Sequence, residues 1–327
     1  MKIGKVSENA YKRSILNQLK TKRKEVVTGA GLGEDCAIFS LKEGGFMASC
    51  VMEGAGNVEY LIIDCVNHLA ARGATPIAIT LQVLLPLNCE EEVLKGIVAE
   101  AEKVCAGLEI QIAQASGKVT GAVNYPFVTV VSYGGIQEAT DYHTVKATKP
   151  GQDIVVSGYI GLQGTAVLAH EYKEEILKRY PKWICDEAAM FSQHLSTVKE
   201  AALAMKSGGC TLLNVSEGGI LASLWELAEG AGVGLTIELK KLPIRQETVE
   251  ICNHLNVNPY ELWSGGCLLM TTEDGQGLVD ALAQADVPAV IVGRITDSND
   301  RLITNEDEVR YLDRPHADSL YEKVKEI

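Results

Sequence analysis

The order of apolar and polar residues predicts helices and strands that alternate along the whole chain. Residues 60–72 repeat their apolar positions with helical spacing, and Gly73 follows them as a stop signal. Residues 90–106 form a second amphipathic helix with Gly107 as its C-cap, and one face carries Val93, Leu94, Ile97, Val98, Ala101 and Val104. Short apolar runs bounded by turn residues predict strands at 77–85, 109–114 and 127–133.

The pattern restarts after a polar segment, Ala147–Asp153, whose sequence ATKPGQD contains a Pro-Gly turn. We place a domain boundary there and predict two domains, residues 1–148 and 149–327. The pattern of the second domain predicts helices from Thr165 and at 186–206, 217–229 and 247–255. Its expected strands are 154–157, 211–214, 235–239, 267–271, 287–292 and 302–304. Both domains therefore belong to the α/β (α+β) class.

Composition narrows the class of protein further. The chain has 327 residues and a formal charge of −13, from 30 basic and 43 acidic side chains. Since nucleic-acid binding needs clustered Lys and Arg, this balance argues against a nucleic-acid partner. No run approaches the roughly 20 apolar residues of a membrane span, so we expect no membrane association. The 9 cysteines are scattered, without a C-x-x-C pair or a secretory signal, and predict a reducing, cytoplasmic location.

Candidate chemistry begins at residues 29–39, GAGLGEDCAIF, where glycines precede two adjacent acids, Glu34 and Asp35. Glycines allow backbone N–H groups to approach an anion, and Mg²⁺ takes one or two carboxylates together with phosphate oxygens. The segment is therefore a candidate corner of a Mg²⁺–nucleotide site. The alternative interpretation is a tight turn that leads into a strand.

Three blocks of sequence, in this order and spacing, resemble the AIR synthase (PurM-like) superfamily. They are GLGEDCAIF at 31–39, NHLAARGATPIAITLQVLLP at 67–86, and SEGGILASLWELAEGAGVGLTIELKKLPI at 216–244 followed by NPYELWSGGCLLM at 258–270. The opening MKIGKVSEN and the segment GYIGLQGTAVLAHEY are similar to the HypE-like, AIR synthase-related branch, which includes hydrogenase maturation factors. The resemblance covers essentially the whole chain.

The resemblance implies a PurM-like two-domain fold. The sheet of the N-terminal domain pairs across a homodimer to close a β-barrel, and a C-terminal α/β domain follows. ATP lies in a cleft at the dimer and domain interface, with Mg²⁺ held by acids of several motifs. An active member is an ATP-dependent enzyme that activates an oxygen as a leaving group, since metal ions neutralise the charge of the transferring phosphoryl group.

The matching motifs assign site residues in this chain. Asp35, Glu217 and Lys118 are the candidate catalytic residues. The candidate cofactor-binding residues are Gly31, Gly33, Glu34, Asp35, Asn67, Gly161, Gly164, Asn214 and Ser216. Acids of the family motifs are replaced at several positions, by Cys50, His68, Lys118 and Asn214, and Gln163 stands where relatives often carry Glu. Each replacement removes a negative charge or adds a positive one, so we do not expect ordinary Mg²⁺–ATP chemistry.

Two explanations fit these replacements. In the first, the chain is a degenerate member that binds a nucleotide or another small molecule, with weak, altered or no catalysis. In the second, Asp35, Cys50 and His68, with Cys36 nearby, form a soft-metal site for Zn²⁺ or Fe²⁺ or an activated thiolate. The alternative interpretation is that Cys36 and Cys50 are small core residues and that His68 is a hydrogen-bonded helix residue. Two rivals stay open: an active ATP-dependent phosphoryl-transfer or dehydration enzyme, and a non-catalytic partner of an active paralogue.

The hydrogenase maturation factors of this branch end in a mobile tail with a terminal cysteine, which becomes carbamoylated. This chain ends HADSLYEKVKEI, and its last cysteine is Cys267, inside an expected strand. We therefore do not expect maturation chemistry on its own tail.

Overall fold

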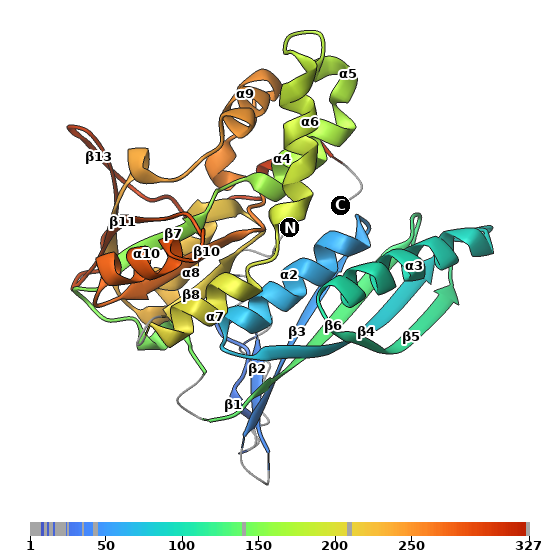
Figure 1. Ribbon diagram of the computed structural model, residues 1–327, viewed down its shortest axis with the longest axis horizontal. Coiled ribbons are helices and arrows are strands. Elements are labelled where there is room, and N and C mark those ends of the chain that lie inside the picture. Colours follow the sequence, from blue (N-terminus) through green and yellow to red (C-terminus); the bar gives the residue numbers. More distant parts are fainter. Residues whose placement is uncertain are drawn as a thin grey trace.

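The computed structural model describes residues 8, 9, 12, 16, 24, 26–34, 36–41, 45–138, 142–207 and 211–324. These residues fold into two β-sheets with helices around and between them (Figure 1). Strands from the first part of the chain, up to residue 136, build one sheet, and strands from residue 153 onward build the other. The division predicted at residues 148 and 149 falls between the two sheets and stays a prediction.

The first sheet has 6 strands in the order β1-β2-β3-β6-β4-β5. Their bounds are β1 Val26–Thr28, β2 Ala37–Ser40, β3 Phe46–Gly54, β4 Thr75–Leu85, β5 Gln111–Val119 and β6 Phe127–Ile136. Neighbours run antiparallel except β4 and β5, which are parallel and joined by helix α3 (Glu91–Gly107). Helices α2 (Val58–Ala71) and α3 cover one face, and no described helix lies against the other (Figure 1).

The second sheet has 7 strands in the order β13-β12-β9-β11-β7-β10-β8. Their bounds are β7 Asp153–Gly158, β8 Thr211–Val215, β9 Gly234–Glu238, β10 Cys267–Thr272, β11 Ala289–Thr296, β12 Arg301–Asn305 and β13 Glu308–Tyr311. Helices α7 (Val198–Lys206), α8 (Gly219–Ala231) and α10 (Gly275–Ala283) pack on this sheet. A separate helical group projects at the top of Figure 1; it contains α4 (Leu162–Glu171), α5 (Lys173–Ile176), α6 (Lys182–Met190) and α9 (Gln246–Leu255). Short 3₁₀ turns complete the chain at Val145–Ala147, Phe191–His194 (η4), Leu239–Lys241, Pro259–Glu261 and Ser319–Glu322 (η7).

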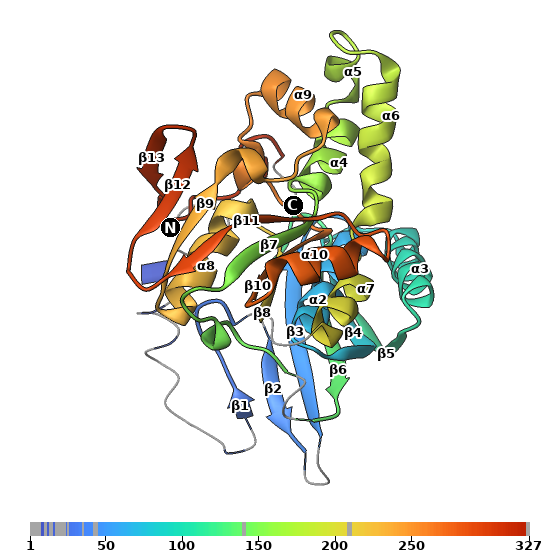
Figure 2. The same ribbon diagram turned by 60° about the vertical axis from the view of Figure 1, so that its left-hand side comes forward.

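Helix α2 joins the two halves. It packs against β3 and β6 of the first sheet and against β8 and α7 of the second half (Figure 2). Every residue from Leu61 to Ala71 is buried. A helix buried on all sides is normally apolar all round, yet this one carries Asp64, Asn67 and His68. Buried polar side chains need partners within the protein, and these partners define the candidate site.

The pattern predicted many of the elements, but it missed β3 and α10 and was wrong at several other positions. The single helix expected at 186–206 is two helices, α6 and α7, because Asn67 of α2 holds the backbone at Leu195 and Thr197 between them. The strand expected at 109–114 is β5, Gln111–Val119, which continues past Lys118 and pairs with β4. Gly107 is the last residue of α3 instead of its C-cap, and Val93 is exposed instead of facing the core.

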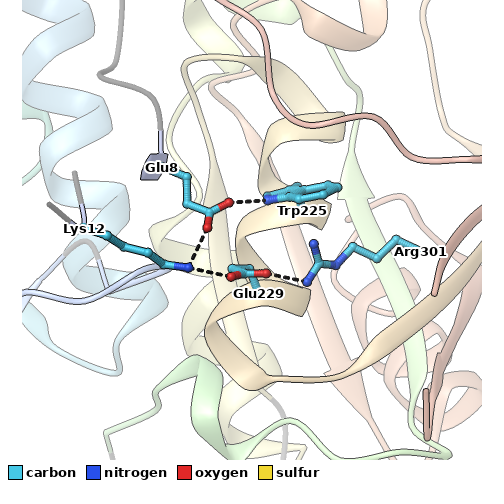
Figure 3. Close-up of polar contacts among 5 residues, drawn as sticks. All are labelled: Glu8, Lys12, Trp225, Glu229 and Arg301. Atoms are coloured by element: carbon cyan, nitrogen blue, oxygen red, sulfur yellow. Dashed lines mark hydrogen bonds and ion pairs between the residues drawn. The ribbon is translucent and has the colours of Figure 1, made fainter. Parts of the chain in front are cut away.

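A cluster on the second sheet anchors the first residues that the structure describes (Figure 3). Lys12 Nζ lies 2.7 Å from Glu229 Oε1 of α8, and Arg301 Nη2 lies 2.6 Å from Glu229 Oε2. Hydrogen bonds from Lys12 and Arg301 lower the pKa of Glu229 to about 2. The Arg301 guanidinium also stacks 4.1 Å from the ring centroid of Trp225, whose Nε1 donates to Glu8. Trp225 therefore packs in this cluster.

Candidate functional site

Asn67 connects α2 to the second half of the chain. Its Nδ2 donates to Leu195 O at 2.7 Å, and its Oδ1 accepts from Thr197 N at 2.8 Å. The side chain is fully buried, so both ends of its amide are engaged inside the protein. In this structure Asn67 fixes the segment that precedes α7, and its assignment to nucleotide binding stays a prediction.

Arg72, just after α2, holds the glycine–acid segment. Its side chain is 1% exposed, and that of Glu34 is 3% exposed. Arg72 Nη2 donates to Gly33 O and lies 3.7 Å from Glu34 Oε2, while Nη1 donates to Leu212 O of β8 at 3.4 Å. Glu34 therefore forms part of a buried ion pair. Asp35 lies outside the described residues, and its catalytic, cofactor and metal assignments stay predictions.

The glycines of this segment build a turn that lies against α8. Glu34 N donates to Gly31 O at 3.3 Å, which closes the turn. Gly33 has a φ of +68°, and a Cβ there would lie 3.0 Å from Glu226 O, so the position favours glycine. The tight-turn interpretation thus describes the local backbone, and the interpretation as a nucleotide corner stays a prediction.

Asp64 is the centre of the buried polar network. Its Oδ1 accepts from Asn214 Nδ2 at 2.7 Å, and its Oδ2 accepts from Trp263 Nε1 at 3.0 Å. All three side chains are buried. Two N–H donors on one carboxylate offset the cost of removing it from water. An aspartate at position 214 would place a second carboxylate against Asp64, which like-charge repulsion disfavours. The neutral amide of Asn214 is therefore more favourable beside Asp64 than a carboxylate would be.

The turn at the start of α4 uses its amide groups within the protein. Gly161 has a φ of +73° and forms the N-cap of α4. Its N–H donates to Ser264 Oγ at 2.7 Å, and Gly164 N donates to Trp263 O at 2.9 Å. Helix N-termini bind phosphate through such amides, and here both predicted phosphate-binding glycines donate to oxygen atoms of the chain.

The N-terminus of α8 receives an acid from the C-terminal part of the chain. Gly218 N donates to Asp318 Oδ2 at 2.7 Å, and Leu320 N donates to Asp318 Oδ1 at 2.9 Å. Burial raises the pKa of Asp318 to about 7 in spite of these bonds, and the nearby Glu217 carboxylate adds to the rise. Asp318 thus occupies the anion position at this helix end and fixes η7 beside Glu217.

A cavity of about 360 Å³ opens beside these helix ends. Ser264 N donates to Ser216 O at 3.3 Å, so two loops run side by side and bring Glu217 and Trp263 to one wall. The other walls come from the end of β3, the first turn of α2, α4 and the segment after Asp318. Its polar lining residues are Glu53, Asn57, Gln163, His170, Glu171 and Glu217, and its aromatic ones are Tyr60, Trp263 and Tyr321. The volume falls in the range of small-molecule sites, roughly 300–1,000 Å³.

Of the three predicted catalytic residues, the structure describes Glu217 and Lys118, and it does not bring these two together. Glu217 lines the cavity, whereas Lys118 is exposed on β5 at the outer edge of the first sheet. Asp35, the third member, is not among the described residues. Ser216 is buried, and its carbonyl accepts from Gly219 N at 3.1 Å.

The predicted metal ligands lie in the interior. Cys50 and His68 are buried, on β3 and α2 respectively. Among the residues that the structure describes, no group of three or more His, Cys, Asp or Glu side chains is placed to hold a metal ion. Hydrogen bonding with the Cys36 and Cys65 thiols, together with burial, raises the pKa of Cys50 well above its ordinary value, which argues against an activated thiolate. The soft-metal set that includes Asp35 stays a prediction.

Sequence reasoning missed four residues of this site: Asp64, Arg72, Trp263 and Asp318. Trp263 is buried and also lines the cavity. The sequence did mark Asp64 and Arg72 in one way, because both are charged residues in a mostly apolar predicted helix. A charge buried in such a helix needs a partner within the protein. No local signal marked Asp318, since its partner Gly218 lies 100 positions earlier.

Fold and site together define a two-domain α/β protein with a cavity between its halves. The chain belongs to the AIR synthase-related family: the model of the AIR synthase related protein N-terminal domain matches residues 14–136, and that of the C-terminal domain matches residues 149–304. No helix in the described part of the chain is long and apolar enough to cross a membrane.

Several known proteins are similar over most of the chain. A carbamoyl dehydratase HypE of Rhodobacter capsulatus is 26% identical over 275 residues, which cover 82% of this chain and 78% of that protein. A solved HypE–HypF complex contains a chain with a TM-score of 0.76 and 22% identity, covering 94% of this chain and 100% of that one. HypE in complex with ATP gives a TM-score of 0.71 at 17% identity, with coverage of 95% and 93%. AaThiL complexed with AMPPCP and TMP gives 0.71 at 16%, with coverage of 94% and 97%. At these identities, the solved structures show the shared fold alone.

Proposed function

We propose that this chain is a HypE-like member of the family that binds a nucleotide or another small metabolite and whose Mg²⁺–ATP site is eroded. The observation that carries the proposal is the hydrogen bond from Asn214 to Asp64. The family resemblance puts an acid at position 214; here an amide replaces it and also engages the Asp64 carboxylate. Mg²⁺ prefers carboxylate and water oxygens, so this exchange weakens its site.

Two further observations support the loss of ordinary ATP chemistry. The amides of Gly161 and Gly164 donate to Ser264 and Trp263, so a phosphate would have to displace these partners. Lys118 is exposed on β5 of the first sheet, whereas Glu217 lies in the turn that follows β8 of the second sheet. The relatives solved with ATP and with AMPPCP support the nucleotide-binding part of the proposal.

Calorimetry and product analysis test this proposal. We expect purified protein to release no ADP, AMP or phosphate from Mg²⁺–ATP above background, because a transferring phosphoryl group needs metal ions that this site no longer holds well. The affinity for ATP should be the same with and without Mg²⁺. Glu217→Gln is the control, since any turnover that it leaves unchanged comes from a contaminant. Tight Mg²⁺-dependent binding with turnover that Glu217→Gln abolishes would establish the active-enzyme alternative instead.

We also propose that the first sheet pairs with a second copy of the chain to close a β-barrel. Along β6, Val128 and Val130 are buried against α2, whereas Thr129 and Val131 alternate with them and face the side without a described helix. Val51 on the neighbouring β3 pairs with Val131 and is 59% exposed. An open sheet face with apolar side chains is typical of an interaction surface.

Sedimentation tests the dimer. We expect a species of twice the 35.2 kDa chain mass at micromolar concentration. Val51→Asp should shift it to the monomer, because the substitution places a charge in the closed interface. Val309→Asp is the matched control, since Val309 is also 59% exposed but lies on β13 of the other sheet. A wild-type monomer would contradict the homodimer and favour a partner of a different chain.

A further inference from the structure

We infer that the cavity beside Trp263 binds a small organic cation with an aromatic or apolar body. The inference rests on the proposed function in one respect, namely that the chain binds a small molecule, and it assigns this cavity to a small metabolite and not to a nucleotide. Its first observation is the charge of the cavity wall. The described residues that line the cavity include Glu53, Glu171 and Glu217 but no Lys or Arg. A wall whose full charges are all negative attracts cations and repels anions.

Aromatic rings supply the second observation. Tyr60, Trp263 and Tyr321 line the same cavity. The bond from Trp263 Nε1 to Asp64 fixes the indole ring, so its orientation is set before a ligand enters. Burial and the carboxylates of Glu59 and Glu100 raise the pKa of Tyr60 to about 12, which keeps its hydroxyl neutral. Cations bind over the faces of Trp and Tyr rings, and desolvated sites strengthen this contact.

The helix ends around the cavity give the third observation. An anionic ligand would need free amides or basic side chains there. At α2, Asn57 Oδ1 accepts from Glu59 N at 2.7 Å, and the α4 and α8 ends use Ser264 and Asp318 in the same way. At least one described amide at each of these three helix ends thus already has a partner in the chain, and no Lys or Arg stands among the described residues of the wall.

Size and lining restrict the ligand further. A cavity of about 360 Å³ lies near the lower end of the range for small-molecule sites, so it suits a molecule of one or two rings. Its apolar lining residues are Met52, Leu61, Ala166, Val167, Ala189, Leu320 and Val324. The ligand class is therefore an amine or a quaternary or heterocyclic cation attached to a compact apolar body.

Three probes of similar size and different charge test the inference: benzyltrimethylammonium, benzyl alcohol and phenylacetate. In calorimetric titrations at low salt, we expect the cation to bind about tenfold more tightly than the neutral probe, through the combined carboxylate and ring contacts. Phenylacetate and inorganic phosphate should not bind in this cavity. Three results would overturn the inference. They are equal affinity for the cation and the neutral probe, tighter binding of the anion, and no binding of the cation at millimolar concentration.

Variants locate the binding. The double substitution Glu53→Gln and Glu217→Gln should weaken binding of the cation about tenfold and change binding of benzyl alcohol less than about twofold, since only the charge is removed. Tyr60→Leu should weaken binding of the cation more than that of the neutral probe. Glu238→Gln is the matched control, because Glu238 is exposed on β9 and does not line the cavity. A control variant that loses as much affinity as the double variant would show a general charge effect and overturn the assignment.

The two proposals fail separately. Mg²⁺-dependent ATP turnover would end the proposed function and leave preferential cation binding intact. Loss of the preference for the cation would end the present inference and leave the absence of ATP turnover intact.

Discussion

Replacing Arg72 with methionine is expected to lower the free energy of unfolding by about 3–5 kcal/mol, as for other buried ion pairs that lose one partner. The Arg72 side chain is 1% exposed and that of Glu34 is 3% exposed, so the substitution leaves a carboxylate in the interior without its cation. It also removes the donors to Gly33 O and Leu212 O, which connect the glycine turn and β8 to the end of α2.

Urea denaturation measures this effect. Arg294→Met is the control, because Arg294 is 66% exposed and pairs with Asp153 at the surface, where such pairs contribute less than about 1 kcal/mol. Adding Glu34→Gln to Arg72→Met should recover part of the lost stability, since it removes a buried negative charge from the position that Arg72 faces. If Arg72→Met lowers the free energy of unfolding no more than Arg294→Met does, the buried ion pair has no structural role.

The elements that the sequence predicted well are those with a strong local pattern. Helix α2 follows from its helical spacing and Gly73, and β10 follows from an apolar run that is buried at every position. The break between α6 and α7 could not be predicted in this way. It depends on the bond from Asn67 Nδ2 to Leu195 O, which joins residues 128 positions apart.

The candidate site was predicted only in part, for a similar reason. Motif positions such as Asn214 and Glu217 followed from the family resemblance, because the flanking glycines fixed the alignment. The resemblance could not show that Asn214 donates to Asp64, which lies 150 positions earlier and is one of 43 acidic residues in the chain. The charge of the cavity wall likewise depends on Glu53, Glu171 and Glu217, which lie in three separate segments that only the fold brings together.

Asp318 is expected to make the chain less stable as the pH rises from about 4 to about 7. Burial raises its pKa from the ordinary value of 3.8 to about 7 in the folded state. The folded chain therefore keeps this proton over a range where the unfolded chain has released it. The resulting stabilisation is complete below about pH 4 and is lost as the pH rises through the folded-state value. The difference between the two pKa values corresponds to roughly 4 kcal/mol.

Asp318→Asn isolates this contribution, because the amide cannot titrate but still accepts one of the two hydrogen bonds from Gly218 N and Leu320 N. We expect the free energy of unfolding of the wild type, relative to this variant, to fall by roughly 4 kcal/mol between pH 4 and pH 8 in urea titrations. Asp313→Asn serves as the control for a lost charge, since Asp313 is exposed in the same part of the chain. Parallel pH profiles for the wild type and Asp318→Asn would show that the buried carboxyl does not titrate in this range. If the stability of the wild type falls with rising pH relative to Asp318→Asn but not relative to Asp313→Asn, the proton on Asp318 stabilises the contacts of η7. One wall of the cavity then depends on that proton.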